Sequence, residues 1–259
     1  MKGQINKILA ENGVFEWAVC DFSAVALKLL PCRAAERLPE GAKSIIMIAF
    51  PYKVEDAAPK NISRYAAVPD YHDIVGEMLK NAAASLSRNF PQNKFEPFAD
   101  NSPIPEVFAA NVAGLGYLGR NGLLIHKKYG SFVFLGEIVT DLELIPDSGG
   151  ENCLDCGRCI SACSSVPNKE TCLSAVTQRK GELSGDEIAR IRSGGSCWGC
   201  DLCSEVCPMN EKAEKTYIKE FTLGYRNSFS PDEDREGRAY NWRGKAVIER
   251  NYKIITEND

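Results

Sequence analysis

Two runs of cysteine constrain this chain more than any other feature of its sequence. Each run has the spacing Cys-x-x-Cys-x-x-Cys-x-x-x-Cys, and together the runs contain eight of the 11 cysteines. The first comprises Cys153, Cys156, Cys159 and Cys163, and the second comprises Cys197, Cys200, Cys203 and Cys207. Three thiolates at this short spacing can surround one corner of an iron–sulfur cubane. The pattern therefore predicts two [4Fe–4S] clusters.

The fourth cysteine of each run is expected to reach the cluster of the other run, as in the bacterial ferredoxin spacing. One cluster is then held by Cys153, Cys156, Cys159 and Cys207. The other is held by Cys197, Cys200, Cys203 and Cys163. This crossing would join both runs in one small domain.

Zinc and disulfide bonds are the alternatives for these cysteines. A zinc site needs only two Cys-x-x-Cys pairs, so the third and fourth cysteines of each run would be unexplained. Disulfides fit an oxidising compartment, whereas the N-terminus lacks the apolar segment of a secretory signal. The longest apolar runs, such as residues 45–50, are also far short of a bilayer span. We therefore expect a cytoplasmic protein that does not contact a membrane.

The chain is expected to form three parts, over residues 1–147, 148–215 and 216–259. The first is predicted to be a layered α/β domain, the second a bacterial-ferredoxin-like domain with both clusters, and the third a charged tail that packs on the core. Helices are predicted over 4–12, 70–88 and 102–113 and near 245–250, and strands over 14–20, 43–52, 95–99 and 130–139. Taken together, these elements predict an α+β fold class.

Asp100 stands between a predicted strand and a predicted helix. The strand ends at Ala99, and Ser102-Pro103 has the serine cap and first-turn proline of a helix start. A carboxyl at this junction could act as an acid if partial burial raised its pKa. The alternative is that Asp100 only neighbours a helix cap.

The glycines from Gly114 to Gly119 match the G-x-G-x-x-G pattern of dinucleotide-binding sites. That pattern must follow a strand and open a helix, so that the helix N-terminus meets a pyrophosphate. Here the glycines follow a predicted helix instead. A flavin or nicotinamide oxidoreductase is therefore kept only as an alternative.

Several stretches of the chain together resemble the epoxyqueuosine reductases, cobalamin-dependent iron–sulfur enzymes of tRNA queuosine synthesis that share core chemistry with corrinoid reductive dehalogenases. Besides the cysteine runs, the resembling stretches are Ser63-Arg64-Tyr65-Ala66, Asp70-Tyr71-His72, Asp100-Asn101-Ser102-Pro103, residues 113–121, Gly130-Ser131, residues 134–138 and Cys172-Leu173-Ser174. Their order across about 60 to 210 matches the family.

The resemblance implies a nitroreductase-like or corrinoid-reductase-like N-terminal domain. It implies that base-off cobalamin lies between this domain and the clusters, which pass electrons to cobalt while Asp100 donates a proton. The expected cofactor contacts are Arg64, Tyr71, His72, Asn121, Ser131, Cys172 and Ser174. The electrons would come from a low-potential donor such as a ferredoxin or flavodoxin.

The chain also departs from the family pattern. It ends about fifty residues after Cys207, where the family continues into helical repeats that help to hold tRNA, and its net charge is −4. The sequence therefore predicts a corrinoid-dependent reductase with an unidentified substrate and does not favour tRNA. The alternative is a non-catalytic two-cluster protein that delivers electrons to a partner enzyme.

Overall fold

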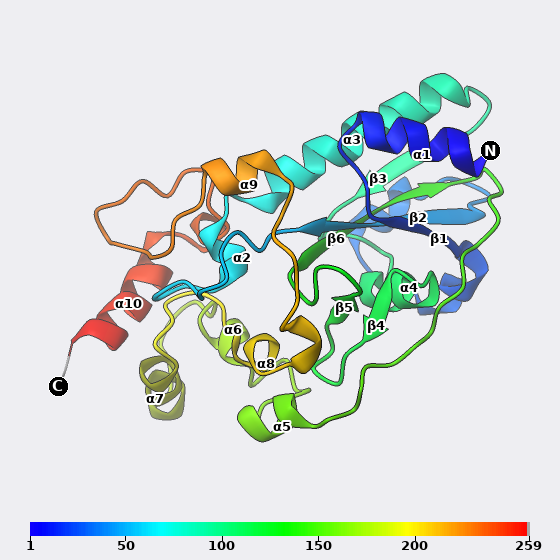
Figure 1. The fold of residues 1–259 in the computed structure, drawn as a ribbon. Helices are drawn as coiled ribbons and strands as arrows, with labels where there is room; N and C mark the ends of the chain where they lie inside the picture. The colour runs from blue at the N-terminus through cyan, green and yellow to red at the C-terminus, as the bar shows by residue number, and fades with distance from the viewer. Residues whose placement is uncertain (258–259) are drawn as a thin grey trace.

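The computed structural model describes residues 1–257 and is built around a four-stranded sheet (Figure 1). The predicted tail 216–259 thus extends two residues beyond the described part of the chain. The strands lie side by side in the order β1 (Trp17–Asp21), β2 (Ser44–Pro51), β6 (Val133–Thr140) and β3 (Phe95–Phe98). Every neighbouring pair is antiparallel. A sheet of this kind with helices packed on it is an α+β fold, as predicted.

The two inner strands, β2 and β6, form the centre of the core. Every residue of β2 is buried, and Ile46 of β2 pairs with Ile138 of β6. A strand covered on both faces needs apolar side chains on both sides, which explains the unbroken run from Ile45 to Phe50. The predicted buried strand and the predicted central strand are both confirmed.

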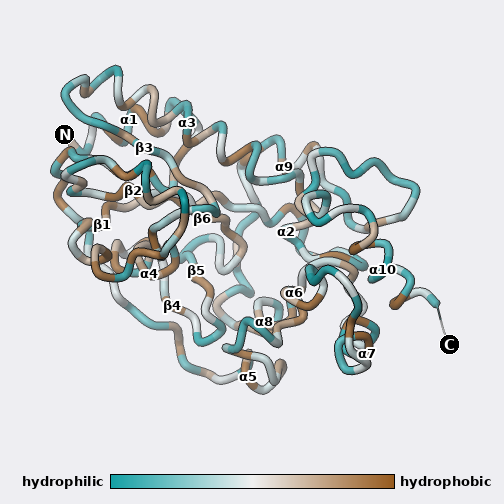
Figure 2. The backbone as a smooth tube through the Cα atoms, turned by 180° about the vertical axis from the view of Figure 1, so that it is seen from behind, coloured by the Kyte–Doolittle hydropathy of each residue, from teal (hydrophilic) through white to brown (hydrophobic). Residues whose placement is uncertain are grey.

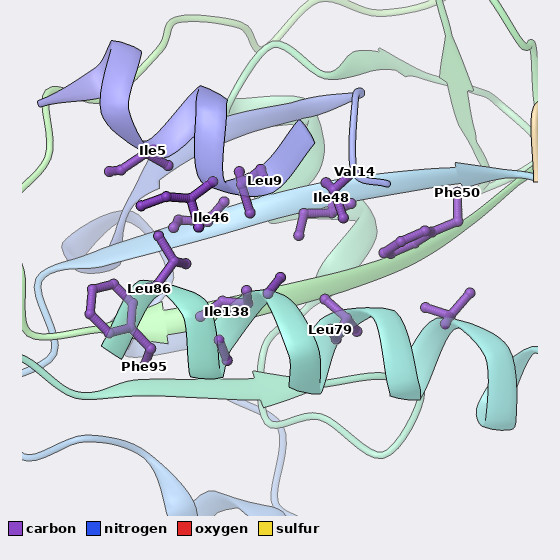
Figure 3. Close-up of a cluster of buried hydrophobic side chains, with 14 of the residues drawn as sticks. Ile5, Leu9, Val14, Ile46, Ile48, Phe50, Leu79, Leu86, Phe95 and Ile138 are labelled. Atoms are coloured by element: carbon purple, nitrogen blue, oxygen red, sulfur yellow. The ribbon is translucent and has the colours of Figure 1, made fainter. Parts of the chain in front are cut away.

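One face of the sheet is covered by α1 (Lys2–Glu11) and α3 (Tyr71–Asn89). Figure 3 shows how side chains from both helices meet those of β2 and β6, among them Leu9, Leu79 and Ile138. Both helices were predicted from their apolar periodicity. Asp70 caps α3 as expected, because its carboxylate accepts a hydrogen bond from the backbone N–H of His72 at 3.0 Å.

The other face is covered by α4 (Glu106–Val112) and by 3-10 turns over residues 22–24, 26–28 and 33–37. The prediction that this helix begins at Ser102-Pro103 is wrong, because α4 begins at Glu106. Ser102 does not cap it. Its hydroxyl instead donates a hydrogen bond to the carboxylate of Glu137 in β6.

The glycine-rich segment forms a hairpin, not a nucleotide-binding loop. The segment begins just after α4 with Gly114, which has a φ of +78°. It continues into β4 (Gly116–Leu118), which pairs with β5 (Leu124–His126). A Cβ at Gly114 would lie 2.4 Å from the carbonyl oxygen of Ser148, so only glycine fits there. The segment therefore has neither the preceding strand nor the following helix of a dinucleotide site.

The cysteine-rich segment consists of short helices joined by long connections. The helices are α5 (Arg158–Ala162), α6 (Leu173–Val176), α7 (Gly185–Gly194) and α8 (Leu202–Glu205). Helix α5 packs on α8, and α7 packs on α6 and on the last helix, α10 (Lys245–Thr256).

The C-terminal part packs on both other parts of the chain. Phe221 of α9 (Lys219–Leu223) enters the core beside α3, while Tyr240 packs with Trp198 and with α2 (Arg64–Ala67). Figure 2 shows that the connection between α9 and α10 is mostly hydrophilic. Among residues 1–257, no helix combines the length and the apolar character that a membrane span requires.

Candidate active site

A cavity of about 620 Å³ lies where the three predicted parts of the chain meet. The N-terminal part supplies Asp70, Tyr71, His72, Asp100 and Phe134 together with Tyr65. The cysteine-rich segment supplies Ser174, Gln178 and Trp198, and the C-terminal part supplies Ala239 and Trp242. This volume is within the range of small-molecule and cofactor sites.

His72 links two aspartates at the start of α3. Its Nδ1 lies 2.7 Å from Oδ1 of Asp70, and its Nε2 lies 3.2 Å from Oδ2 of Asp100. Asp70 is placed by its role as the cap of α3, so the helix start fixes one side of the imidazole. Asp100, which follows β3, fixes the other.

Asp100 has an unusual backbone conformation. Its φ is +60°, a left-handed region that a non-glycine residue enters at a cost of about 1–3 kcal/mol. Hydrogen bonds from Asn101 N–H to the carbonyl of Ala99 and from Ser102 N–H to the carbonyl of Asp100, both at 2.8 Å, form the tight turn. The turn directs the carboxylate of Asp100 toward His72. The strained backbone of Asp100 is therefore part of the geometry that forms this contact.

The proton of this cluster is held by His72. Hydrogen bonds to Asp100 and Asp70 raise the pKa of His72 to about 10. The hydrogen bond from His72 in turn lowers the pKa of Asp100, against the effect of its partial burial. The condition under which Asp100 itself could act as an acid, a pKa raised by burial, is not met in this arrangement, because the neighbouring imidazolium has the larger effect. At neutral pH the pair is an imidazolium beside a carboxylate.

Tyr71 adds a neutral hydrogen-bond donor to the same wall. Its ring stacks on Phe134 with centroids 4.2 Å apart and an interplanar angle of 9°. Its hydroxyl lies close enough to Asp100 for each group to shift the pKa of the other, and burial raises the pKa of Tyr71 far above its ordinary value, so the phenol stays protonated. Three groups therefore surround one end of the cavity: an imidazolium, a carboxylate and a phenol.

The opposite wall belongs to the cysteine-rich segment. Gln178 donates a hydrogen bond to the hydroxyl of Tyr65 at 3.3 Å, and Trp198 is fully buried beside it. Trp198 follows Cys197 directly, and Ser174 lies two residues after Cys172. The second cysteine run therefore adjoins the cavity.

One group of cysteines comes together around a separate small cavity. The group combines three cysteines of the first run with the last cysteine of the second, namely Cys153, Cys156, Cys159 and Cys207. Burial raises the pKa of Cys207, and the proximity of the other three thiols adds to this effect. The structure thus brings together the four cysteines that the crossed arrangement predicts for one cluster.

The second group of cysteines is less regular. Cys163 and Cys172 both lie close enough to Cys203 to raise its pKa further, after burial as the main cause. The thiol of Cys197 is buried and donates to the carbonyl of Asn61 at 2.8 Å. Cys172 also neighbours Cys200, so it lies between the second run and the cavity wall. In residues 1–257 no three His, Cys, Asp or Glu side chains converge on a single metal ion.

Four of the predicted cofactor contacts, Arg64, Asn121, Ser131 and Cys172, do not line the large cavity. Arg64 is buried and donates to Glu205 at 2.6 Å and to backbone carbonyls of residues 55–57, while its own N–H bonds to Asp201. Asn121 borders the small cavity of the first cysteine group and bonds to Cys203. Ser131 is buried and exchanges hydrogen bonds with Asn210. The cavity itself brings together Tyr71, His72 and Ser174 with Asp100.

Sequence reasoning assigned no role to several side chains at or near the cavity. Trp198 and Trp242 line it, and the carboxyl groups of Glu106 and Glu137 lie behind the turn of Asp100. A visible signal existed for Glu137, because it is the one acid in the otherwise apolar stretch from Phe132 to Val139. The two tryptophans carried no spacing signal.

The cavity has an acid–base pair on its α+β sheet domain and a cysteine-rich segment on its opposite wall. This arrangement is that of an oxidoreductase. Comparison with known proteins makes the assignment specific. The family described as epoxyqueuosine reductase QueG, DUF1730, matches residues 33–101. The epoxyqueuosine reductase from Lactococcus garvieae is 31% identical to this chain, and the match covers 85% of this chain and 71% of that relative. The epoxyqueuosine reductase from Synechocystis is 34% identical, over 76% of this chain and 72% of that relative. This chain belongs to the epoxyqueuosine reductase family.

Solved structures agree with this assignment. Epoxyqueuosine reductase from Streptococcus thermophilus superposes with a TM-score of 0.79 at 26% identity, over 98% of this chain and 80% of that one. A B12-dependent reductive dehalogenase shares the fold alone, with a TM-score of 0.51 at 14% identity over 96% of this chain and 36% of that one. The chain spans 61% of the length of the relative from Gloeobacter violaceus, to which it is 36% identical over 71% of its own length.

Proposed function

We propose that this chain is a reductase that passes electrons through two [4Fe–4S] clusters to a cobalamin in the large cavity, where an oxygen group is removed from a substrate. The observation that carries the proposal is the composition of the cavity wall. His72 and Asp100 stand on one side, and Trp198 and Ser174, which adjoin the second cysteine group, stand on the other.

The cysteines fit the clusters. Cys153, Cys156, Cys159 and Cys207 surround one small cavity, as a cubane with four thiolate ligands requires. A cubane occupies the space between its ligands, so the four sulfurs need not converge on one point. The second cluster would be held by Cys163, Cys197, Cys200 and Cys203, and its position beside Trp198 makes it the cluster nearer to the cavity.

The cavity fits a large cofactor with a flat ring. Its walls carry the aromatic side chains of Tyr65, Tyr71, Phe134 and Trp242. Its charged groups are at the His72 end, and Ser174 and Gln178 are polar groups on the opposite wall. Cobalamin, when bound, supplies a strongly reducing centre for the cleavage of a carbon–oxygen bond. Ser174 and Tyr71 are its proposed polar contacts. Arg64, Asn121 and Ser131 do not line the cavity and are not among these contacts.

The His72 end of the cavity is proposed to supply protons. Reductive loss of an epoxide oxygen as water consumes two electrons and two protons, so the site needs an acid close to the substrate. His72 holds a proton at Nε2 against Asp100, and Tyr71 holds another at its hydroxyl. Asp100, as the carboxylate facing the cavity between them, would accept the proton from His72 and pass it to the substrate.

The substrate class follows from the family. An epoxyqueuosine reductase has been crystallised with an epoxyqueuosine-modified tRNA stem loop, which makes the same modified base the first candidate here. The net charge of −4 gives this chain little general attraction for RNA. The proposal is therefore the reductive removal of oxygen from a substrate, and epoxyqueuosine in tRNA is the first substrate to test.

The test is anaerobic reconstitution followed by a turnover assay. The reconstituted chain should bind about eight irons, bind cobalamin, and convert an epoxyqueuosine-containing tRNA stem loop when given a low-potential ferredoxin or flavodoxin. Binding of both cofactors without conversion of the stem loop would leave the reductase chemistry and move the search to another epoxide. Eight irons without cobalamin binding would favour the electron-transfer protein.

A further inference from the structure

Two buried carboxyl groups lie behind the turn that carries Asp100, and the proposed function gives them no role. Glu137 points from β6 toward α4 and has no exposed surface. Glu106, the first residue of α4, is partly exposed along its length, but its Oε1 is sheltered from solvent. Its carboxyl faces that of Glu137.

Two oxygens of this pair, one on each residue, have no hydrogen-bond donor. Oε1 of Glu137 accepts from the hydroxyl of Ser102, but Oε2 of Glu137 and Oε1 of Glu106 have no hydrogen-bond partner. An unpaired carboxylate oxygen away from water costs several kcal/mol, on the order of the values for buried charges without partners. One proton placed between the two carboxyl groups would satisfy both oxygens at once.

In the part of the chain that the structure describes, no basic side chain acts on the pKa of either carboxyl group. Met47 of β2 and Phe98 of β3 flank Glu137 in the sheet. The ionisable groups that act on Glu106 are Asp100 and Glu137, Tyr71 of α3 faces it, and the group that acts on Glu137 is Glu106. Burial raises the pKa of both carboxyl groups, and repulsion by Asp100 adds to this effect at Glu106 while repulsion by Glu106 adds to it at Glu137, so the pair keeps a proton at neutral pH.

The pair holds both ends of the Asp100 turn. The hydroxyl of Ser102 donates a hydrogen bond to the carboxyl of Glu137, and the backbone N–H of Asp100 lies close enough to the carboxyl of Glu106 to lower its pKa. Asp100 needs such support, because its left-handed backbone is strained. With both carboxyl groups ionised, their repulsion would act directly on the two attachments.

We propose that Glu106 and Glu137 share one proton and, as a carboxyl pair, clamp the Asp100 turn in the conformation that faces His72. They are positioning residues, and their importance for turnover rests on the proposed function. The clamp itself is a property of the fold and can be tested without a substrate. Loss of the shared proton would release the turn and separate Asp100 from His72.

The first experiment detects the shared proton. Infrared spectra of the reconstituted full chain at neutral pH should show a protonated carboxyl band that shifts in deuterium oxide. The band should disappear in E137Q and in E106Q, because a glutamine amide can donate to the remaining carboxylate and replaces the shared proton. A wild-type spectrum without this band would overturn the proposal.

The second experiment detects the clamp through the NMR titration of His72. The chain has only two histidines, so His126 serves as an internal reference, and burial together with Lys128 and Lys127 lowers its pKa to about 4. E137Q and E106Q should keep the high pKa of His72. Glu106→Ala should lower that pKa by about 1–3 units, since Asp100 is its largest cause.

Ser102→Ala keeps the experiment decisive if Glu106→Ala does not fold. This variant removes one attachment of the turn and leaves the carboxyl pair in place, so the pKa of His72 should fall while the infrared band remains. An unchanged titration of His72 in Ser102→Ala and in a folded Glu106→Ala would refute the clamp. Neither readout depends on cobalamin or turnover, so failure of the clamp is distinguishable from failure of the proposed reductase.

Discussion

The N-terminal sheet and the cysteine-rich segment are held together by different forces. All eight residues of β2 are buried, and the cores on both sides of the sheet are continuous. Between residues 148 and 172, by contrast, Ser165 alone is buried. Hydrophobic burial is sufficient to explain the sheet. Residues 148–172 have too little buried apolar surface to fix their own shape, so we expect their order to depend on the proposed cluster ligands and on contacts with their neighbours.

Removal of iron should give the largest difference between the two regions. With a chelator under reducing conditions, residues 148–172 should lose hydrogen-exchange protection, while β2 and β6 stay protected, because only the first region contains proposed cluster ligands. Cys159→Ser should have the same regional effect and abolish turnover. Cys20→Ser, outside both runs, is the control that should keep the iron. Equal loss of protection in both regions would contradict the comparison.

Replacement of His72 should give the next largest effect, and it should be confined to chemistry. Turnover of His72→Ala should fall about 10²–10⁴-fold, the usual contribution of a positioned acid, while cobalamin binding persists. Asp73→Asn, in the same helical turn but outside the cavity, should leave turnover near wild type. Wild-type turnover in His72→Ala would remove His72 from the proton path.

Truncation in the sheet core tests the same comparison from the other side. Leu79→Ala should lower the free energy of unfolding of the N-terminal region by about 2–5 kcal/mol, because Leu79 is fully buried against the sheet (Figure 3). Iron content of the folded protein should not change. Leu223→Ala, at a side chain that is 86% exposed, should change that free energy by less than about 0.5 kcal/mol. Denaturant titration measures both.

The pH dependence of stability should show the smallest effect. His72 has a folded-state pKa raised to about 10, so its ion pairs stabilise the fold fully below its ordinary value of 6.5 and progressively less as the pH rises through 10. Because the imidazole is 43% exposed, the change should stay below about 1 kcal/mol. His72→Gln should remove this alkaline slope, and a slope that persists in that variant would assign it to another group.

Much of the fold followed from local patterns. The periodicity of α1 and α3 and the apolar runs of β2 and β6 each reflect burial on known faces, which a sequence records directly. The start of α4 did not follow, because Ser102 forms a bond with Glu137 that is distant in sequence and replaces the expected cap. Tertiary partners of this kind leave no local signal.

The site was predictable to a similar degree. The spacing of the cysteines anticipated that Cys207 joins Cys153, Cys156 and Cys159, because the pattern encodes the crossing. The lowered pKa of Asp100 could not be predicted from the sequence, since it depends on a hydrogen bond to His72 that only the folded chain forms. The hydrogen bonds of Arg64 to Asp201 and Glu205 were not predictable either, because these partners lie far from Arg64 in the sequence. Ligand spacing is local information, whereas pKa values and ion pairs depend on the whole fold.

The most direct test of the account is an anaerobic EPR titration of the iron-reconstituted chain with cobalamin, in wild type and in Trp198→Ala. The account predicts a saturable base-off Co(II) signal in the wild type, with about eight irons per chain, and weaker binding in the variant, because Trp198 belongs to the cavity wall beside the second cysteine group. A wild-type chain that holds both clusters and binds no cobalamin would contradict it.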